Sequence, residues 1–174
     1  MIKEIHEQAQ VLERTLRCRL YEGMPSFDID ALPEGFFAGY SRIHVIGCGT
    51  AMHAGTIGKE LIEQLARVPV EVSLASEFRY RNPILPEGCL VLAISQSGET
   101  ADTLAALRLA QSHGAKVLAI VNAPGSTMAR EADWVLYTHA GPEISVASTK
   151  AFMVQIGLLY LVAIELARVN GRMD

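Results

Sequence analysis

Short apolar runs alternate with amphipathic stretches along most of this chain of 174 residues, and that alternation constrains its fold more than any other feature. The apolar runs are nearly continuous and rich in Val, Ile and Leu, which is typical of strands buried on both faces of a parallel sheet. We expect five strands, at residues 43–48, 70–74, 90–94, 116–121 and 134–138, and helices at 51–66, 102–113 and 149–169, with a short helical turn at 126–131. The sequence therefore predicts the α/β class: a three-layer α/β/α sandwich around a five-stranded parallel sheet, with the flavodoxin-like strand order 2-1-3-4-5.

The N-terminal part of the chain lies outside this alternation. Residues 2–20 carry apolar side chains at helical spacing and predict a helix. Residues 21–41 are rich in Gly, Pro and Asp and predict a connector. We therefore expect an N-terminal helix and connector over residues 1–41, followed by one α/β domain over residues 42–174.

Composition excludes several classes of protein. The formal net charge is −4 and no block of basic residues occurs, which argues against nucleic acid as a partner. The three cysteines, Cys18, Cys48 and Cys89, lack metal-ligand spacing, and the five histidines share no spacing, so no metal site is predicted. We interpret the cysteines as reduced and expect a cytoplasmic protein, since the first residues also lack the pattern of a signal peptide.

The longest apolar stretch covers residues 151–167 and is interrupted by Gln155 and Glu165. It is too short to predict a membrane span, and we expect no membrane association. A helix that is apolar on most sides is buried in a core or an interface. One face of a sheet would not readily cover all of its side chains, so we expect the chain to form a homodimer.

A turn rich in hydroxyl groups follows the third predicted strand. It reads Ser95-Gln96-Ser97-Gly98-Glu99-Thr100 and comes directly before an amphipathic stretch. The first N–H groups of a helix are unpaired and the helix dipole favours an anion, so such a turn can hold a phosphate group. Ser95, Gln96, Ser97 and Thr100 would add neutral donors, which favours a small phosphorylated metabolite. The alternative is that Ser and Thr here only cap the helix.

A second turn, Gly47-Cys48-Gly49-Thr50-Ala51, follows the first predicted strand. In the predicted strand order the first and third strands are neighbours, and ligands of such sheets lie beyond the carboxyl ends of the strands at this switch point. The turn is not a dinucleotide fingerprint, because Met52 stands where its third glycine would fall. We expect Thr50 to supply one hydroxyl to the ligand of the first turn.

The run over residues 143–150 precedes the last predicted helix. Ser148 or Thr149 is a natural N-cap, and helix entry explains both. It does not explain Glu143, a carboxylate on the ligand side of the sheet and a weak catalytic candidate. We expect Lys150 to pair with Glu143 or Glu99, or to be solvated.

These motifs resemble a known family. The runs Cys48-Gly49-Thr50, Ala75-Ser76-Glu77-Phe78-Arg79-Tyr80, Ser95 to Leu104 and Val146-Ala147-Ser148-Thr149-Lys150-Ala151-Phe152 are similar to the first SIS domain in the isomerase part of glucosamine-6-phosphate synthases, which are glutamine–fructose-6-phosphate aminotransferases. The resemblance covers nearly the whole chain and implies a SIS fold that binds fructose 6-phosphate or glucosamine 6-phosphate. It implies that Ser95, Gln96, Ser97 and Thr100 hold the phosphate and that Thr50, Ala51, Val146 and Ser148 contact the sugar. Ala51 stands where a serine is common in the family, and Ser145 where a glycine is common.

The resemblance also implies partners and limits. Enzymes of this family join a glutaminase domain to two SIS domains, and the second SIS domain carries the catalytic glutamate, lysine and histidine. We expect this chain to lack both other domains, to bind sugar phosphate without any cofactor, and to be inactive alone. Two alternatives stay open: a stand-alone SIS sensor of sugar phosphates, or a self-sufficient aldose–ketose isomerase that uses Glu143 with a histidine of a neighbouring chain.

Overall fold

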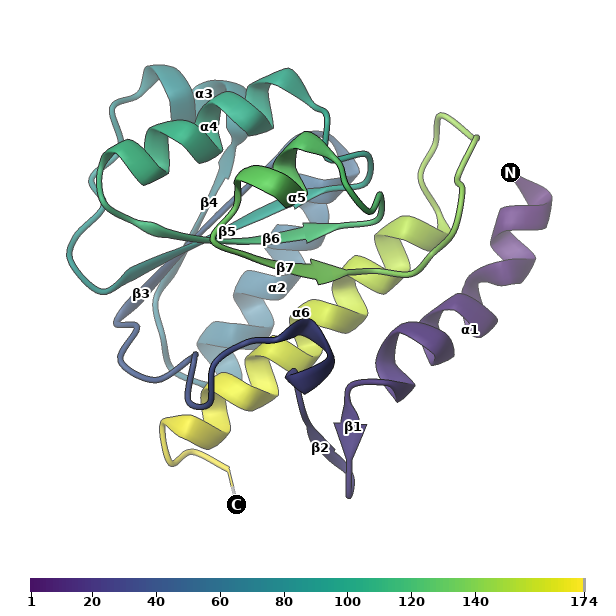
Figure 1. Ribbon diagram of the computed structural model, residues 1–174, viewed down its shortest axis with the longest axis horizontal. Coiled ribbons are helices and arrows are strands. Elements are labelled where there is room, and N and C mark those ends of the chain that lie inside the picture. Colours follow the sequence, from purple (N-terminus) through teal and green to yellow (C-terminus); the bar gives the residue numbers. More distant parts are fainter. Residues whose placement is uncertain (174) are drawn as a thin grey trace.

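The computed structural model describes residues 1–173, and an open parallel sheet lies at its centre (Figure 1). Its strands are β3 (Arg42–Gly47), β4 (Val70–Leu74), β5 (Cys89–Ser95), β6 (Lys116–Val121) and β7 (Trp134–Tyr137). They are hydrogen-bonded in the order β4-β3-β5-β6-β7, and all neighbouring pairs are parallel. The predicted 2-1-3-4-5 order is therefore confirmed, and β3 and β5 are neighbours at the switch point.

Helices cover both faces of the sheet. On one face lie α3 (Ala75–Tyr80), α4 (Ala101–Ser112) and α5 (Thr127–Glu131), and on the other lie α2 (Thr50–Leu65) and α6 (Lys150–Val169) (Figure 1). Successive side chains of β5 alternate between two cores: Leu90, Leu92 and Ile94 pack toward α2 and α6, whereas Val91 and Ala93 pack toward α3 and α4. Both faces are buried, which explains why the strands are apolar without a polar alternation.

The N-terminal region forms more structure than the sequence indicates. The helix α1 (Ile2–Arg17) ends earlier than predicted, and the expected connector contains a short hairpin, β1 (Leu20–Tyr21) and β2 (Met24–Pro25), and a 3₁₀ turn, η1 (Asp28–Asp30). The fully buried Arg19 guanidinium anchors this region. It makes two hydrogen bonds to the Asp30 carboxylate, at 2.7 and 2.5 Å, and a third to the carbonyl of Tyr137 at the end of β7.

The apolar helix α6 is buried within this chain. It packs between α1 and α2, and its side chains join the core on the α2 face of the sheet. At Gly58 of α2 the backbone comes so close that an added Cβ would lie 2.8 Å from the Leu159 side chain. By length and composition α6 could cross a membrane, but α1, α2 and the sheet cover most of its surface. Among its large apolar side chains, that of Tyr160 is exposed to solvent. The chain itself therefore covers more of α6 than one face of a sheet would, and the homodimer stays a prediction.

Candidate functional site

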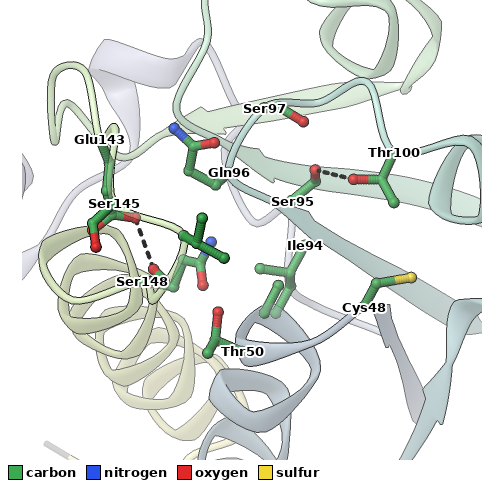
Figure 2. A pocket seen from close by; sticks show the side chains of 13 residues that line it. Cys48, Thr50, Ile94, Ser95, Gln96, Ser97, Thr100, Glu143, Ser145 and Ser148 are labelled. Carbon is green, nitrogen blue, oxygen red and sulfur yellow. Dashed lines mark hydrogen bonds between the residues drawn. The ribbon is translucent and has the colours of Figure 1, made fainter.

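Polar side chains from three separate segments line a cavity of about 210 Å³ at the carboxyl ends of β3 and β5 (Figure 2). The segments are the β3–α2 turn, the β5–α4 turn and the loop before α6. The lining residues are Cys48, Thr50, Ala51, Ile94, Ser95, Gln96, Ser97, Thr100, Glu143, Ser145, Val146, Ser148 and Gln155. Every residue singled out from the sequence as a site candidate is among them, so the structure brings the three motifs together.

The β5–α4 turn is closed by its own hydroxyl groups. The Ser95 hydroxyl lies 3.3 Å from the Thr100 hydroxyl (Figure 2). The Ser95 hydroxyl also accepts a hydrogen bond from the Gly98 amide at 3.0 Å, and the Ser97 hydroxyl accepts one from the Glu99 amide at 3.2 Å. Thr100 is the N-cap residue of α4, yet its side chain makes no capping hydrogen bond. Capping alone therefore does not explain why a hydroxyl stands at this position.

Gly98 permits the shape of this turn. Its φ is +67°, a left-handed conformation that costs a residue with a side chain about 1–2 kcal/mol. An added Cβ would also lie 2.2 Å from the hydroxyl and 2.7 Å from the Cβ of Ser126, the N-cap of α5. The turn is thus packed directly against the start of α5.

The acidic residue of the turn, Glu99, binds the first residue of α5. Its carboxylate accepts a hydrogen bond from the Thr127 amide at 2.7 Å, and this bond and the Thr127 hydroxyl lower the pKa of the Glu99 carboxyl. Glu99 is absent from the cavity lining, whereas the residues on either side of Gly98–Glu99 belong to it. The predicted phosphate donors therefore face the cavity without a carboxylate among them.

Three helix N-termini converge on the cavity. Thr50 and Ala51 open α2, Thr100 precedes α4, and Ser148 lies just before α6. Each helix has at least 12 residues, and the N-terminus of a helix carries unpaired N–H groups and a partial positive charge. Among residues 1–173 no Lys or Arg lines the cavity, and the Glu143 carboxylate already caps the N-terminus of α6. The attraction for an anion therefore comes from the N-termini of α2 and α4, which no side chain caps, and from neutral donors.

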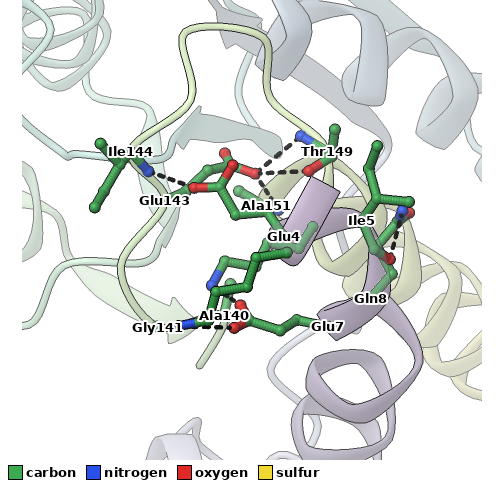
Figure 3. Close-up of polar contacts among 12 residues, drawn as sticks. Glu4, Ile5, Glu7, Gln8, Ala140, Gly141, Glu143, Ile144, Thr149 and Ala151 are labelled. Carbon is green, nitrogen blue, oxygen red and sulfur yellow. Dashed lines mark hydrogen bonds and ion pairs between the residues drawn. The ribbon is translucent and has the colours of Figure 1, made fainter. Parts of the chain in front are cut away.

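The carboxylate of Glu143 caps α6 (Figure 3). One oxygen accepts hydrogen bonds from the amides of Thr149 at 2.9 Å and Ala151 at 3.2 Å, and the other accepts from the Ser148 hydroxyl at 2.8 Å. The Thr149 side chain makes no capping bond of its own. Helix entry thus explains Glu143 as well, which the sequence pattern alone did not show.

The loop over residues 140–149 is held in place by α1. The Glu4 carboxylate accepts hydrogen bonds from the amides of Ile144 at 2.7 Å and Ser145 at 3.2 Å (Figure 3). The Ile144 amide is the main cause that lowers the pKa of Glu4 to about 2. The buried ammonium of Lys150 pairs with Glu7 at 2.6 Å. The predicted pairing of Lys150 with Glu143 or Glu99, or its solvation, is therefore wrong, because Glu7 of α1 lies nearer.

Four lining residues were not singled out from the sequence as contacts: Cys48, Ile94, Ser145 and Gln155. Ile94 belongs to the end of an apolar strand, where nothing marks it as a site residue. Cys48 stands in the turn after β3, and we expected Thr50 of that turn to contact the ligand. Gln155 did carry a signal, because it interrupts an apolar helix. Val146 lies in the lining, but its side chain is fully exposed to solvent. Within residues 1–173, no group of three His, Cys, Asp or Glu side chains could hold a metal ion.

A family model matches this combination of sheet and turns. The SIS domain model covers residues 37–165, and the chain belongs to the SIS domain family. Over 176 residues the chain is 55% identical to a glutamine–fructose-6-phosphate aminotransferase (isomerizing) of Symbiobacterium thermophilum, and it is 50% identical over 175 residues to the enzyme of the same name from Clostridium tetani. Each alignment takes in 100% of this chain but 29% of the relative, so the chain spans less than a third of the length of these curated relatives.

Solved structures show the same relationship. The C-terminal domain of glucosamine-fructose-6-phosphate aminotransferase from Francisella tularensis superposes with a TM-score of 0.92 at 38% identity, over 99% of this chain and 49% of that chain. A glucosamine-6-phosphate deaminase from Thermotoga maritima superposes with a TM-score of 0.77 at 20% identity and shares the fold. The resemblance drawn from the sequence motifs is confirmed at the level of the family.

Proposed function

We propose that this chain binds a hexose 6-phosphate, either fructose 6-phosphate or glucosamine 6-phosphate, in the cavity between β3, β5 and α6. The observation that supports this most is the convergence of the uncapped N-termini of α2 and α4 and of hydroxyl and amide side chains on one cavity, whose single carboxylate among the described residues, Glu143, is engaged in capping α6. Such a site favours an anion whose charge is compact and whose remainder is polar. The names of the relatives that match the whole chain point to the same substrates.

The phosphate is assigned to the β5–α4 turn. Ser95, Gln96, Ser97 and Thr100 offer donors around the N-terminus of α4, where the helix dipole adds to their effect. The sugar is assigned to the remaining wall, formed by Thr50, Ala51, Val146 and Ser148. A cavity of about 210 Å³ is smaller than the roughly 300–1,000 Å³ of pockets that take drug-sized ligands, which favours a monosaccharide phosphate over a dinucleotide.

We infer that the chain acts as the first SIS domain of a glucosamine-6-phosphate synthase, with residues 42–174 as that domain and residues 1–41 as an extension whose α1 braces the ligand loop. Its partners would then be a second SIS domain and a glutaminase domain, which is consistent with the 29% of the relatives that it spans. The free thiols of Cys18, Cys48 and Cys89 support a reducing, cytoplasmic location.

Homodimer formation is part of this proposal, and surfaces other than α6 support it. Exposed apolar side chains lie on α1, at Ile2 and Ile5, and on the ligand loop, at Ile144 and Val146. Glu4 joins these two segments through its hydrogen bonds to the loop. Exposed apolar side chains on adjoining segments are typical of a surface that a partner covers, here a second copy of the chain or the second SIS domain.

The chain's part in the reaction would be to anchor the substrate, and no cofactor is needed for that. Phosphate binding fixes the sugar for groups supplied elsewhere, which lowers the barrier through positioning. The isomerase alternative depends on Glu143 as an acid or base. Its carboxylate already accepts hydrogen bonds from Ser148, Thr149 and Ala151, which favours a structural role.

The test is the affinity for fructose 6-phosphate of the Ser97→Ala/Thr100→Ala double variant. Each hydrogen bond to a charged group contributes about 1.5–3 kcal/mol, so losing two should weaken binding at least a hundredfold. The matched control is Thr56→Ala/Ser112→Ala, which removes one Ser and one Thr hydroxyl that are exposed and remote from the cavity lining. Calorimetry that finds equal affinity in the double variant and the control would overturn the phosphate assignment.

A further inference from the structure

Asn122 is a half-buried residue that belongs to none of the sequence motifs and lies outside the cavity lining. It follows β6 directly, at the carboxyl end of the strand that pairs with β5. Its backbone amide donates a hydrogen bond to the carbonyl of Gln96 at 3.1 Å, within the turn assigned to the phosphate. The main chain of Asn122 is therefore attached to the phosphate-binding side of the proposed site.

The side chain of Asn122 makes three more hydrogen bonds, all at the start of the ligand loop, residues 140–149. Its Oδ1 atom accepts from the Thr138 hydroxyl at 2.9 Å and from the Ala140 amide at 2.8 Å, and its Nδ2 group donates to the Gly141 carbonyl at 2.8 Å. These partners fit one orientation of the side-chain amide, because a backbone amide only donates and a backbone carbonyl only accepts. One side chain thus fixes the start of the loop whose later part lines the cavity.

The other two anchors of the ligand loop bind it from helices. The Glu4 carboxylate of α1 holds the middle of the loop, and the Glu143 carboxylate joins the loop to the start of α6. Of these three anchors within residues 1–173, Asn122 is the one that also binds the β5–α4 turn. It therefore connects the segment assigned to the phosphate with the segment assigned to the sugar.

We propose that Asn122 is a positioning residue whose side chain holds the ligand loop in a fixed place relative to the phosphate-binding turn. The proposal rests on the function proposed above. If the loop is in place in a fraction of the molecules only, the apparent dissociation constant for a ligand that needs the loop rises by the inverse of that fraction. Inorganic phosphate needs the turn alone. The Asn122 side chain would therefore set the preference for a sugar phosphate over phosphate alone.

The experiment compares Asn122→Ala with the wild-type chain by NMR titration with fructose 6-phosphate and with inorganic phosphate. The substitution removes the three bonds to the loop region and keeps the backbone bond to Gln96. We expect the dissociation constant for fructose 6-phosphate to rise roughly 5- to 20-fold and that for inorganic phosphate to change less than about twofold. The Ala140 amide, which loses its acceptor, should exchange faster with solvent. Asn170→Ala, at the exposed end of α6, is the matched control and should change none of these quantities.

Thr138→Val provides a milder second variant, since it keeps the size of a buried side chain and removes the hydroxyl that donates to Asn122. It should show the same split between the two ligands, at roughly two- to threefold, and it decides the question if Asn122→Ala does not fold. An affinity for fructose 6-phosphate that the folded variants leave unchanged would overturn the proposal, as would an equal loss for both ligands. A wild-type chain that does not bind fructose 6-phosphate would instead overturn the proposed function itself.

Discussion

Replacing Gly98 with alanine should damage the β5–α4 turn more than its small size suggests. The structure places two demands on this residue: a φ of +67° and room for the Ser126 side chain, whose hydroxyl would lie 2.2 Å from the new Cβ. Atoms that close must move apart. Ser126 accepts a capping hydrogen bond from the Ala129 amide, so its displacement would also weaken the start of α5.

The expected loss of folding free energy follows from the backbone conformation of Gly98 and from the contact with Ser126. A left-handed conformation costs a residue with a side chain about 1–2 kcal/mol, and loss of an N-cap costs about 1 kcal/mol. Gly98→Ala should therefore lower the free energy of unfolding by about 2–3 kcal/mol. For a chain of this size each kcal/mol corresponds to roughly 2–4 °C, so the melting temperature should fall by roughly 5–10 °C.

Gly114 offers a matched control in the same part of the fold. It follows α4, its φ is +80°, and an added Cβ would meet nothing within 4 Å. Gly114→Ala should therefore show the cost of the backbone conformation alone, about 1–2 kcal/mol. Urea unfolding would measure both variants, and Ser126→Gly should recover part of the loss only in the Gly98→Ala background. Equal losses in the two alanine variants, or no rescue by Ser126→Gly, would refute the role assigned to this contact.

Two further predictions concern Glu4 and Glu143. The pKa of Glu4 is lowered from 4.5 to about 2, so its contribution to stability is present above pH 4.5 and is lost as the pH falls toward 2. Unfolding curves should be less dependent on pH across that window in Glu4→Gln than in wild type, and parallel curves would contradict the loop-anchoring role. For Glu143, the purified chain should not interconvert fructose 6-phosphate and glucose 6-phosphate, because this carboxylate caps α6. Turnover in a coupled assay that disappears in Glu143→Gln would establish the isomerase alternative.

The sequence predicted the sheet well because each strand is buried on both faces. A run such as residues 89–95 carries its own signal, since almost any polar residue within it would be unpaired. The order of the strands followed from the chirality and packing rules for alternating strands and helices. The structure of the connector could not be predicted, because β1, β2 and η1 are short and the buried Arg19 that pairs with Asp30 also donates to the carbonyl of the distant Tyr137.

In the candidate site, too, the sequence identified some features and missed others. The three motifs were identifiable because hydroxyl-rich turns at strand ends have a direct physical use, and the strand order placed them together. The contacts between segments were not identifiable. The pairing of Lys150 with Glu7, and of Glu4 with the loop, depends on how α1 packs against α6, and no local pattern specifies that packing. The hydrogen bonds of Asn122 likewise become visible only when its surroundings are known.

The central claim is that a sugar phosphate binds with its phosphate at the N-terminus of α4. An amide-resolved NMR titration of the chain with fructose 6-phosphate tests it most directly, with fructose as the control ligand. The account predicts saturable shifts of the Ser97, Gly98, Thr100 and Ala101 amides with fructose 6-phosphate, and no saturation with fructose at the same concentrations. Saturable shifts confined to another surface of the chain, or equal responses to both ligands, would contradict it.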